Sequence, residues 1–227
     1  DLFGSGAAYY GVPGTQDKST MINSNFAGSI WIGGLDAGGQ LKVAAMTYRQ
    51  SGYDFWPGPL DTTNASTDYD VCNEYDQLWY MTRAEVENQV FNGVVSENIK
   101  KWPGNPLDLT KPHGTLLAPF FDLAGDNFYD PTAGDYPHYD VYNKAAINNL
   151  GVCEARLFGD ATLWWVFNDK GDIHTETGGQ SIGLEVRAQA FGFKTNDDVN
   201  NMTFYSYEVI NRSSFTLNKT YFTVWTD

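Results

Sequence analysis

Four aspartates stand close together in the segment from Phe120 to Pro137, which reads FFDLAGDNFYDPTAGDYP. No lysine or arginine occurs between Lys111 and Lys144. Carboxylates this close repel one another unless a cation or water lies among them. The segment therefore needs a source of positive charge for the four side chains, which are those of Asp122, Asp126, Asp130 and Asp135.

Calcium is the cation that this composition favours, because Ca²⁺ takes about six to eight oxygen ligands on a backbone that bends sharply between them. Gly125 can supply a bend. The segment resembles the short Asp-rich calcium loops of dockerin and thrombospondin repeats, although Ala124 stands where those loops have Asp or Asn, and no Glu stands at the twelfth position. A solvated acidic loop is the alternative. We expect one Ca²⁺, with ligands among Asp122, Asp126, Asn127, Asp130 and Asp135.

A second group with possible chemistry is the pair His174 and Glu176, in the polar segment DKGDIHTETGG. Residues two apart on a strand share a face, so this pair could bind a metal or act as acid and base. The rival interpretation is a polar loop between two strands. The chain has three histidines and no HExxH spacing, so we predict no catalytic residue.

The seven tryptophans are the third group. Exposed rings such as those of Trp56 and Trp102 could stack on sugars, but tryptophans beside aliphatic strand residues are mostly core. A carbohydrate-binding or hydrolase module is therefore the alternative to a non-enzymatic module.

Two cysteines, Cys72 and Cys153, lie far apart and form no CxxC motif, so zinc and thioredoxin-like sites have no support. A disulfide between them would suit an exported protein, and two buried thiols are the alternative. We predict the disulfide.

The charge of the chain excludes some partners. Its net charge is −14, and its 14 lysines and arginines are scattered, which argues against nucleic acid or an anionic membrane surface as the main partner. No run is apolar and long enough to predict a transmembrane segment. The sequence opens on Asp1 and closes on the strand-like YFTVWTD, so we expect a fragment of a longer protein.

The elements that must position these residues are mostly strands. Two apolar runs flank Asp36-Ala37-Gly38-Gly39 and predict a β-hairpin over residues 28–45. Further strands are predicted at LWWVFNDKG, at IGLEVRAQAFGF with one apolar face, and at FYSYEVI and YFTVW, taken as adjacent antiparallel strands.

One helix is predicted over residues 83–92, because Thr82 and Glu85 form a capping box. The stretch 96–118, rich in proline and glycine, is expected to be ordered loop. These elements predict an all-β fold, an antiparallel β-sandwich with one short helix and long ordered loops, forming a single domain over residues 1–227.

Several long motifs resemble the N-terminal region of very large secreted surface proteins that the type IX secretion system exports. The resemblance covers nearly the whole chain, although no sorting domain stands in it. It is carried by FAGSIWIGGLDAGGQLKVAAMTYRQSGYDFWPGPLD, TRAEVENQ, APFFDLAGDNFYDPTAGDYP, LWWVFNDKGDIHTETGG and FYSYEVINRSS.

This resemblance implies an extracellular or cell-surface location and an adhesin-like, non-enzymatic role. It implies as partners the other domains of a parent chain, the type IX secretion machinery, and surface glycans or neighbouring surface proteins. Asp61-Thr62-Thr63 also looks like the Asp-Thr-x motif that such bacteria O-glycosylate, which makes Thr62 an expected glycosylation site.

Overall fold

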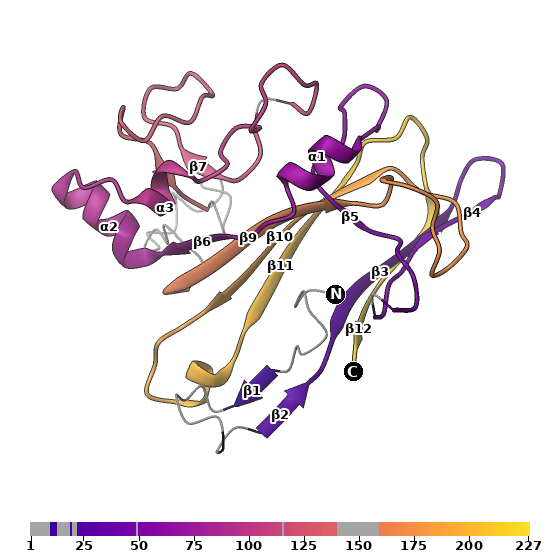
Figure 1. The fold of residues 1–227 in the computed structure, drawn as a ribbon, viewed down its shortest axis with the longest axis horizontal. Helices are drawn as coiled ribbons and strands as arrows, with labels where there is room; N and C mark the ends of the chain where they lie inside the picture. Colours follow the sequence, from indigo (N-terminus) through magenta and orange to yellow (C-terminus); the bar gives the residue numbers. More distant parts are fainter. Residues whose placement is uncertain (1–9, 13–18, 20–21, 49, 115, 140–158) are drawn as a thin grey trace, which may run out of the picture. The chain divides into compact units, whose positions relative to one another are not determined.

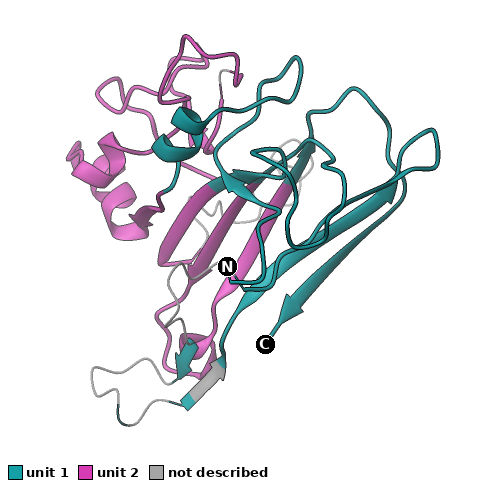
Figure 2. Ribbon diagram, turned by 45° about the vertical axis from the view of Figure 1, so that its right-hand side comes forward, with its two compact units in different colours: residues 1–76, 166–186, 209–227 teal, residues 77–165, 187–208 magenta. Residues whose placement is uncertain are grey.

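The computed structural model describes residues 10–12, 19, 22–48, 50–114, 116–139 and 159–227. Its chain divides into two compact units (Figure 2). Unit 1 consists of residues 1–76, 166–186 and 209–227, and unit 2 of residues 77–165 and 187–208. Both units are therefore assembled from segments that lie far apart in the sequence.

Unit 1 holds a three-stranded antiparallel sheet in the order β12-β3-β4, drawn in Figure 1. Its strands are β3 (Gly28–Leu35), β4 (Leu41–Ala44) and β12 (Asn218–Thr226). The predicted hairpin over residues 28–45 is confirmed by β3 and β4. Its turn forms because the Asp36 side chain accepts hydrogen bonds from the backbone N–H groups of Gly38 and Gln40, and Gly39 adopts a positive φ of 79°.

The remaining elements of unit 1 are short. Strands β1 (Tyr10–Val12) and β2 (Ile22–Asn25) pair antiparallel. Strand β5 (Trp56–Pro57) pairs with β9, and helix α1 (Tyr69–Glu74) begins at the N-cap Asp68, whose side chain accepts from the Val71 N–H group. The core of this unit contains Ile32, Ala44, Leu60, Val71, Tyr75, Val166, Ile182 and Val186.

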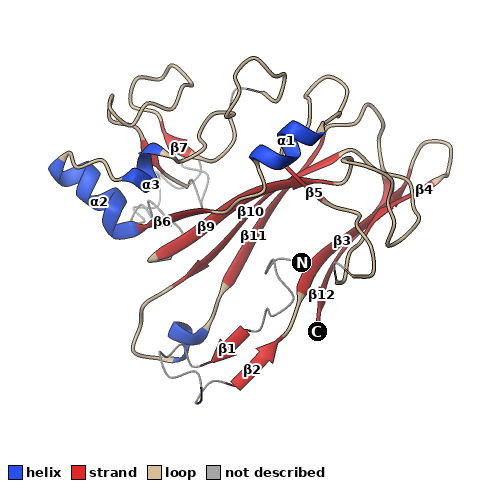
Figure 3. Ribbon diagram, in the orientation of Figure 1, coloured by secondary structure: helices blue, strands red, loops and turns tan. Residues whose placement is uncertain are grey.

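Unit 2 contains the longest α-helix in the described residues, α2 (Arg83–Asn92), which Figure 3 shows in blue. Its bounds match the predicted helix, and the capping box between Thr82 and Glu85 is present. The helix ends at Gly93 with a φ of 70°, the left-handed conformation that glycine adopts readily. Helix α3 (Glu97–Lys100) falls in a stretch predicted as loop, and its N-cap is Ser96.

Packing in unit 2 centres on aromatic residues. Strand β6 (Trp79–Thr82) pairs antiparallel with β9, and β7 (Phe120–Phe121) with β8 (Tyr136–Pro137). The ring of Trp164 lies 5.6 Å from that of Trp79 and 6.3 Å from that of Trp102. These three tryptophans are buried, together with Met81, Val86 and Ile99.

Three long strands have residues in both units: β9 (Ala161–Asn168), β10 (Leu184–Gly192) and β11 (Phe204–Asn211). A 3₁₀-helix, η2 (Asp198–Asn201), precedes β11. The sheet order is β11-β10-β9-β5, with β6 also pairing with β9. The chain has the predicted all-β, antiparallel, sandwich-like fold.

Two details of the strand prediction are wrong. The segments FYSYEVI and YFTVW are not neighbours, because β11 pairs with β10 and β12 pairs with β3. Strand β10 also lacks a purely polar face, since Glu185 and Gln189 are buried. A buried carboxylate must be satisfied within the protein, and Glu185 is satisfied through Arg212.

Candidate functional site

The acidic loop, residues 122–135, begins with an aspartate that binds its own backbone. Asp122 lies after β7, and its carboxylate accepts hydrogen bonds from the N–H groups of Gly125 at 2.6 Å, Asp126 at 3.3 Å and Asn127 at 2.7 Å. Asn127 takes a left-handed φ of 60°, which turns the chain back toward the carboxylate. These N–H donors, that of Asn127 foremost, lower the pKa of Asp122.

The other aspartates of the loop follow the same rule. Asp126 accepts from the N–H group of Phe128. Asp130 accepts from the hydroxyl of Thr132 at 2.6 Å and from its N–H group at 2.8 Å, and these bonds lower the pKa of Asp130. Asp135 is buried and accepts from the N–H groups of Leu123 at 2.9 Å and Asp130 at 2.8 Å.

Backbone N–H groups therefore supply much of the positive potential that the sequence requires here. Asp135 links the two ends of the loop. Asp122, Asp126 and Asp130 each accept from N–H groups two to five residues further along the chain. Within the described residues, no group of three or more His, Cys, Asp or Glu side chains is gathered closely enough to hold a metal ion. Calcium binding by Asp122, Asp126, Asn127, Asp130 and Asp135 stays a prediction.

His174 lies in a loop of unit 1, not on a strand, and is 2% exposed. Its Nδ1 lies 2.7 Å from the carbonyl oxygen of Val43, and its Nε2 lies 2.6 Å from that of Asp169. Both ring nitrogens therefore face carbonyl oxygens of the protein, and the buried carboxylate of Asp54 lies 3.5 Å from Nδ1.

Glu176 is also held by backbone and hydroxyl groups. One of its carboxylate oxygens accepts from the N–H group of Thr47 at 3.2 Å and from the Thr47 hydroxyl. The Glu176 N–H group donates to Asp54 at 3.1 Å. His174 and Glu176 thus serve to attach the loop 169–180 to the segment 43–54, through bonds that leave neither nitrogen of the imidazole for a substrate.

Two aspartates of this region carry the attachment, and sequence reasoning missed both. The Asp169 carboxylate accepts from the N–H groups of Ile182, Gly183 and Leu184 at 2.5, 2.8 and 2.7 Å. Asp54 accepts from the Thr177 hydroxyl at 2.6 Å and from the N–H group of Ala45 at 3.2 Å. We call Asp54, Asp169 and His174 the buried polar cluster. The turn sequence Asn168-Asp169-Lys170-Gly171 was the one local signal for it.

Burial has the largest influence on the pKa of Asp169. Desolvation raises the pKa of this carboxyl group, and the three N–H donors oppose that rise without cancelling it.

The remaining predicted site residues are placed apart from these. Cys72 lies on α1, half-buried, and burial raises the pKa of its thiol; Cys153 lies outside the described residues, so the predicted disulfide does too. Thr62 is exposed in the turn 61–66, where the Asp61 carboxylate accepts from the N–H group of Thr63 at 2.7 Å.

All seven tryptophans lie in the described part of the chain. Trp102 is buried and donates to the carbonyl of Pro119 at 3.1 Å. Trp56 is half-buried, with its ring 5.8 Å from that of His174. The rings of Trp31 and Trp225 stack on each other at 6.1 Å. The rings of these four tryptophans thus contact other groups of the protein.

Comparison of the chain with protein-family models, with curated proteins and with solved structures gave no match. The resemblance to type IX-exported surface proteins stays a prediction, together with the location and the partners that it implies. None of the helices among the described residues reaches the length and hydrophobicity that a bilayer crossing requires.

Proposed function

We propose that the chain is a non-enzymatic structural or adhesive module of a large extracellular surface protein exported by the type IX secretion system. One observation carries the non-enzymatic part: the buried polar cluster is occupied by hydrogen bonds within the protein. Both nitrogens of His174 contact carbonyl oxygens, and Asp169 binds three backbone N–H groups. A catalytic acid or base must instead reach the proton that it transfers.

The location and export route in this proposal rest on the resemblance of the sequence motifs alone. The O-glycosylation of Thr62 belongs to the same proposal, and the exposure of Thr62 on a tight turn suits a modifying enzyme. Partners are other domains of the parent chain, and surface glycans or neighbouring surface proteins.

The second candidate function is a carbohydrate-binding or hydrolase module. Aromatic rings that stack on sugars must present a flat face to solvent. Trp102 is buried, and the face of Trp56 is close to His174 and to Gly171, where an added Cβ would collide with the indole. This packing favours the structural role over sugar binding.

A panel of glycans and peptides tests the two functions. We expect no turnover by the native chain, and we expect His174→Gln to lower the free energy of unfolding by about 2–4 kcal/mol, since it disturbs the buried contacts of both ring nitrogens. Glu176→Gln is the variant closest in shape to the native side chain, and Asp172→Asn is the exposed control in the same loop. Turnover that Glu176→Gln abolishes and Asp172→Asn retains would overturn the proposal.

Calcium stabilisation is the part of this proposal that a titration decides. A cation that binds only the folded chain raises stability by RT ln(1 + [L]/Kd), so saturating calcium is expected to raise Tm by several degrees and EDTA to reverse the rise. Asp126→Asn is the test variant, because Asp126 holds a local turn through the N–H group of Phe128, and an asparagine oxygen can still accept that bond. A Tm that neither calcium nor EDTA moves contradicts calcium binding.

A further inference from the structure

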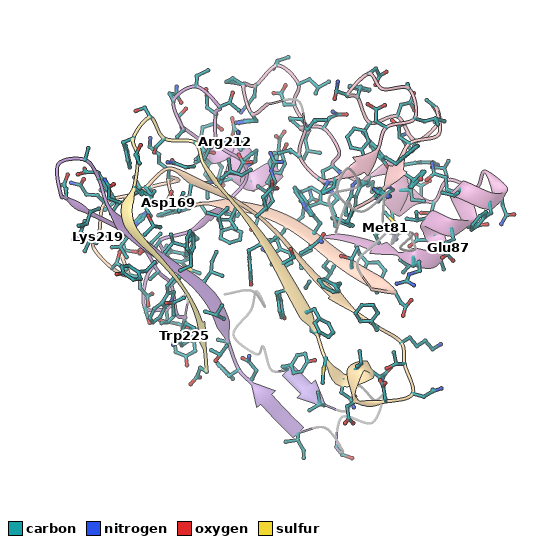
Figure 4. All side chains as sticks on the ribbon, turned by 180° about the vertical axis from the view of Figure 1, so that it is seen from behind. Met81, Glu87, Asp169, Arg212, Lys219 and Trp225 are labelled. Atoms are coloured by element: carbon teal, nitrogen blue, oxygen red, sulfur yellow. The ribbon has the colours of Figure 1, made fainter. Side chains whose placement is uncertain are left out.

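Among the described residues, β12 lies at the edge of its sheet and has one side unpaired. In the described part of the chain, β3 is its one partner strand. Figure 4 labels Lys219 and Trp225 toward its two ends. Three large side chains in the middle of the strand are strongly exposed: Tyr221 by 74%, Phe222 by 62% and Val224 by 69%.

The exposed residues continue a buried apolar face. Residues paired across an antiparallel ladder project to the same side of the sheet. Phe222 is paired with Ile32 and Val224 with Ile30, and both isoleucines are buried. The apolar face of this sheet therefore continues from β3 onto β12, where nothing in the described residues covers it.

Natural edge strands are usually protected by charge, proline or bulges. The sequence of β12, NKTYFTVWT, contains no proline and one charged residue, Lys219. The irregular register lies between Asn218 and Tyr221, at the Lys219 end, and Lys219 has a φ of 51°. From Tyr221 to Thr226 the register is regular, so six uncharged residues form a regular pairing edge.

We propose that this edge pairs antiparallel with β12 of a second copy of the chain, about a two-fold axis through Thr223. The free N–H and C=O groups of an edge select an extended strand as the partner. The axis through Thr223 puts Phe222 opposite Val224 and Tyr221 opposite Trp225, which are the aromatic and β-branched cross-strand pairs that stabilise antiparallel sheets.

Charge complementarity singles out a second copy. The same axis brings the Lys219 end of β12 in each copy beside Asp227 of the other. Asp227 continues the ladder through its backbone, since its N–H group donates to Ala27 and its carbonyl accepts from Phe26, and one carboxylate oxygen accepts from the Tyr48 hydroxyl. Two opposite-charge pairs thus flank the apolar centre, in a chain whose net charge of −14 otherwise opposes self-association.

The product is one continuous antiparallel sheet with twice the strands of β12-β3-β4. Because the axis is perpendicular to the sheet, the apolar faces of the two copies lie on the same side. Phe222 and Val224 of both copies then form one patch bordered by Ile30 and Ile32. This inference is independent of the proposed function, since it requires neither export nor calcium.

The molar mass of the 227-residue chain, measured by sedimentation equilibrium against concentration, tests the pairing. We expect a reversible dimer that Val224→Lys weakens by roughly a hundredfold or more, since the lysine would face Phe222 in an apolar strip. Leu41→Lys is the matched control, because Leu41 is 59% exposed on β4, at the opposite edge of the same sheet. Circular dichroism of each variant verifies that it is folded.

A cysteine scan tests the register. Thr223→Cys is expected to form a disulfide-linked dimer under mild oxidation, because the two introduced thiols would face each other across the axis. Val224→Cys is expected to link far less by itself and to link efficiently in a mixture with Phe222→Cys. Peptide mapping separates these links from any that involve Cys72 or Cys153.

Three results would each overturn the proposal. The first is a monomer up to millimolar concentration. The second is a dimer that Leu41→Lys weakens as much as Val224→Lys does. The third is a Thr223→Cys variant that does not link to itself.

Discussion

Replacing Asp169 by alanine is expected to lower the free energy of unfolding by about 4 kcal/mol or more. The side chain is fully buried and accepts three backbone N–H groups. Leaving a buried donor without an acceptor costs about 1–3 kcal/mol for each group. Urea unfolding of the native chain and of Asp169→Ala measures the difference directly.

The control for this substitution is Asp172→Ala, an exposed aspartate three residues further along the same turn. It is expected to change stability by less than about 1 kcal/mol. A loss in Asp169→Ala no larger than that of the control would contradict the role assigned to the three N–H contacts.

The pH dependence of Asp169 gives a second measurement of the same group. Burial raises the pKa of Asp169 in the folded chain above its value in the unfolded chain. The contribution of this group to stability is therefore fully present below the unfolded pKa and is lost as the pH rises through the folded pKa. Asp169→Asn, which cannot ionise, is expected to lack this part of the stability profile.

Removing Arg212 is expected to lower the free energy of unfolding by about 3–5 kcal/mol, because it takes the paired guanidinium away from the buried carboxylate of Glu185. Glu185 is fully buried on β10, and Arg212 approaches both of its carboxylate oxygens, at 3.0 and 3.2 Å. The N–H group of Leu60 donates to the same carboxylate at 3.1 Å. Thermal and urea unfolding of Arg212→Ala measure the loss.

A double-mutant cycle separates the pair from its surroundings. Arg212→Ala combined with Glu185→Gln is expected to be more stable than Arg212→Ala alone, because the second change removes the buried charge with which Arg212 was paired. The pair Arg187–Glu208, at 3.9 Å with the Glu208 side chain 64% exposed, is the control and is expected to contribute less than about 1 kcal/mol. If breaking either pair lowers the free energy of unfolding by the same amount, burial of Glu185 does not determine the loss of stability in Arg212→Ala.

The sequence predicted well the elements whose causes are local. The capping box of Thr82 and Glu85 determines where α2 begins, and the Asp36 turn determines the β3–β4 hairpin, because the interacting groups lie within a few residues of each other. The alternation of residues in β10 predicted a strand, but it did not predict that Glu185 is buried. The partner of Glu185 is Arg212, which lies far from it in the sequence.

Long-range pairing limited the prediction of the candidate site. The spacing of aspartates in the acidic loop suggested a cation, and the donors found for Asp122 are N–H groups of the same loop, which Asx turns make available. Hydrogen bonding of Asp122 to its own loop could have been predicted from the sequence, since Gly125 follows Asp122 by three residues. The partners of His174 and Asp169 could not have been predicted, because the tertiary fold brings Val43 and the segment 182–184 to them.

The pairing of β3 with β12 has a consequence for the order in which the chain acquires its structure. The two strands are separated by most of the sequence, and unit 1 also requires residues 166–186. During synthesis, the β3–β4 hairpin can form as soon as residues 28–44 have left the ribosome. The third strand of this sheet, β12, emerges only after β11. Contacts at such sequence separation slow the rate-limiting step, because the entropy of loop closure precedes the gain from pairing. Until β12 pairs with β3, Ile30 and Ile32 lie on an unpaired edge strand of the nascent chain. During that time this strand would be a binding site for chaperones.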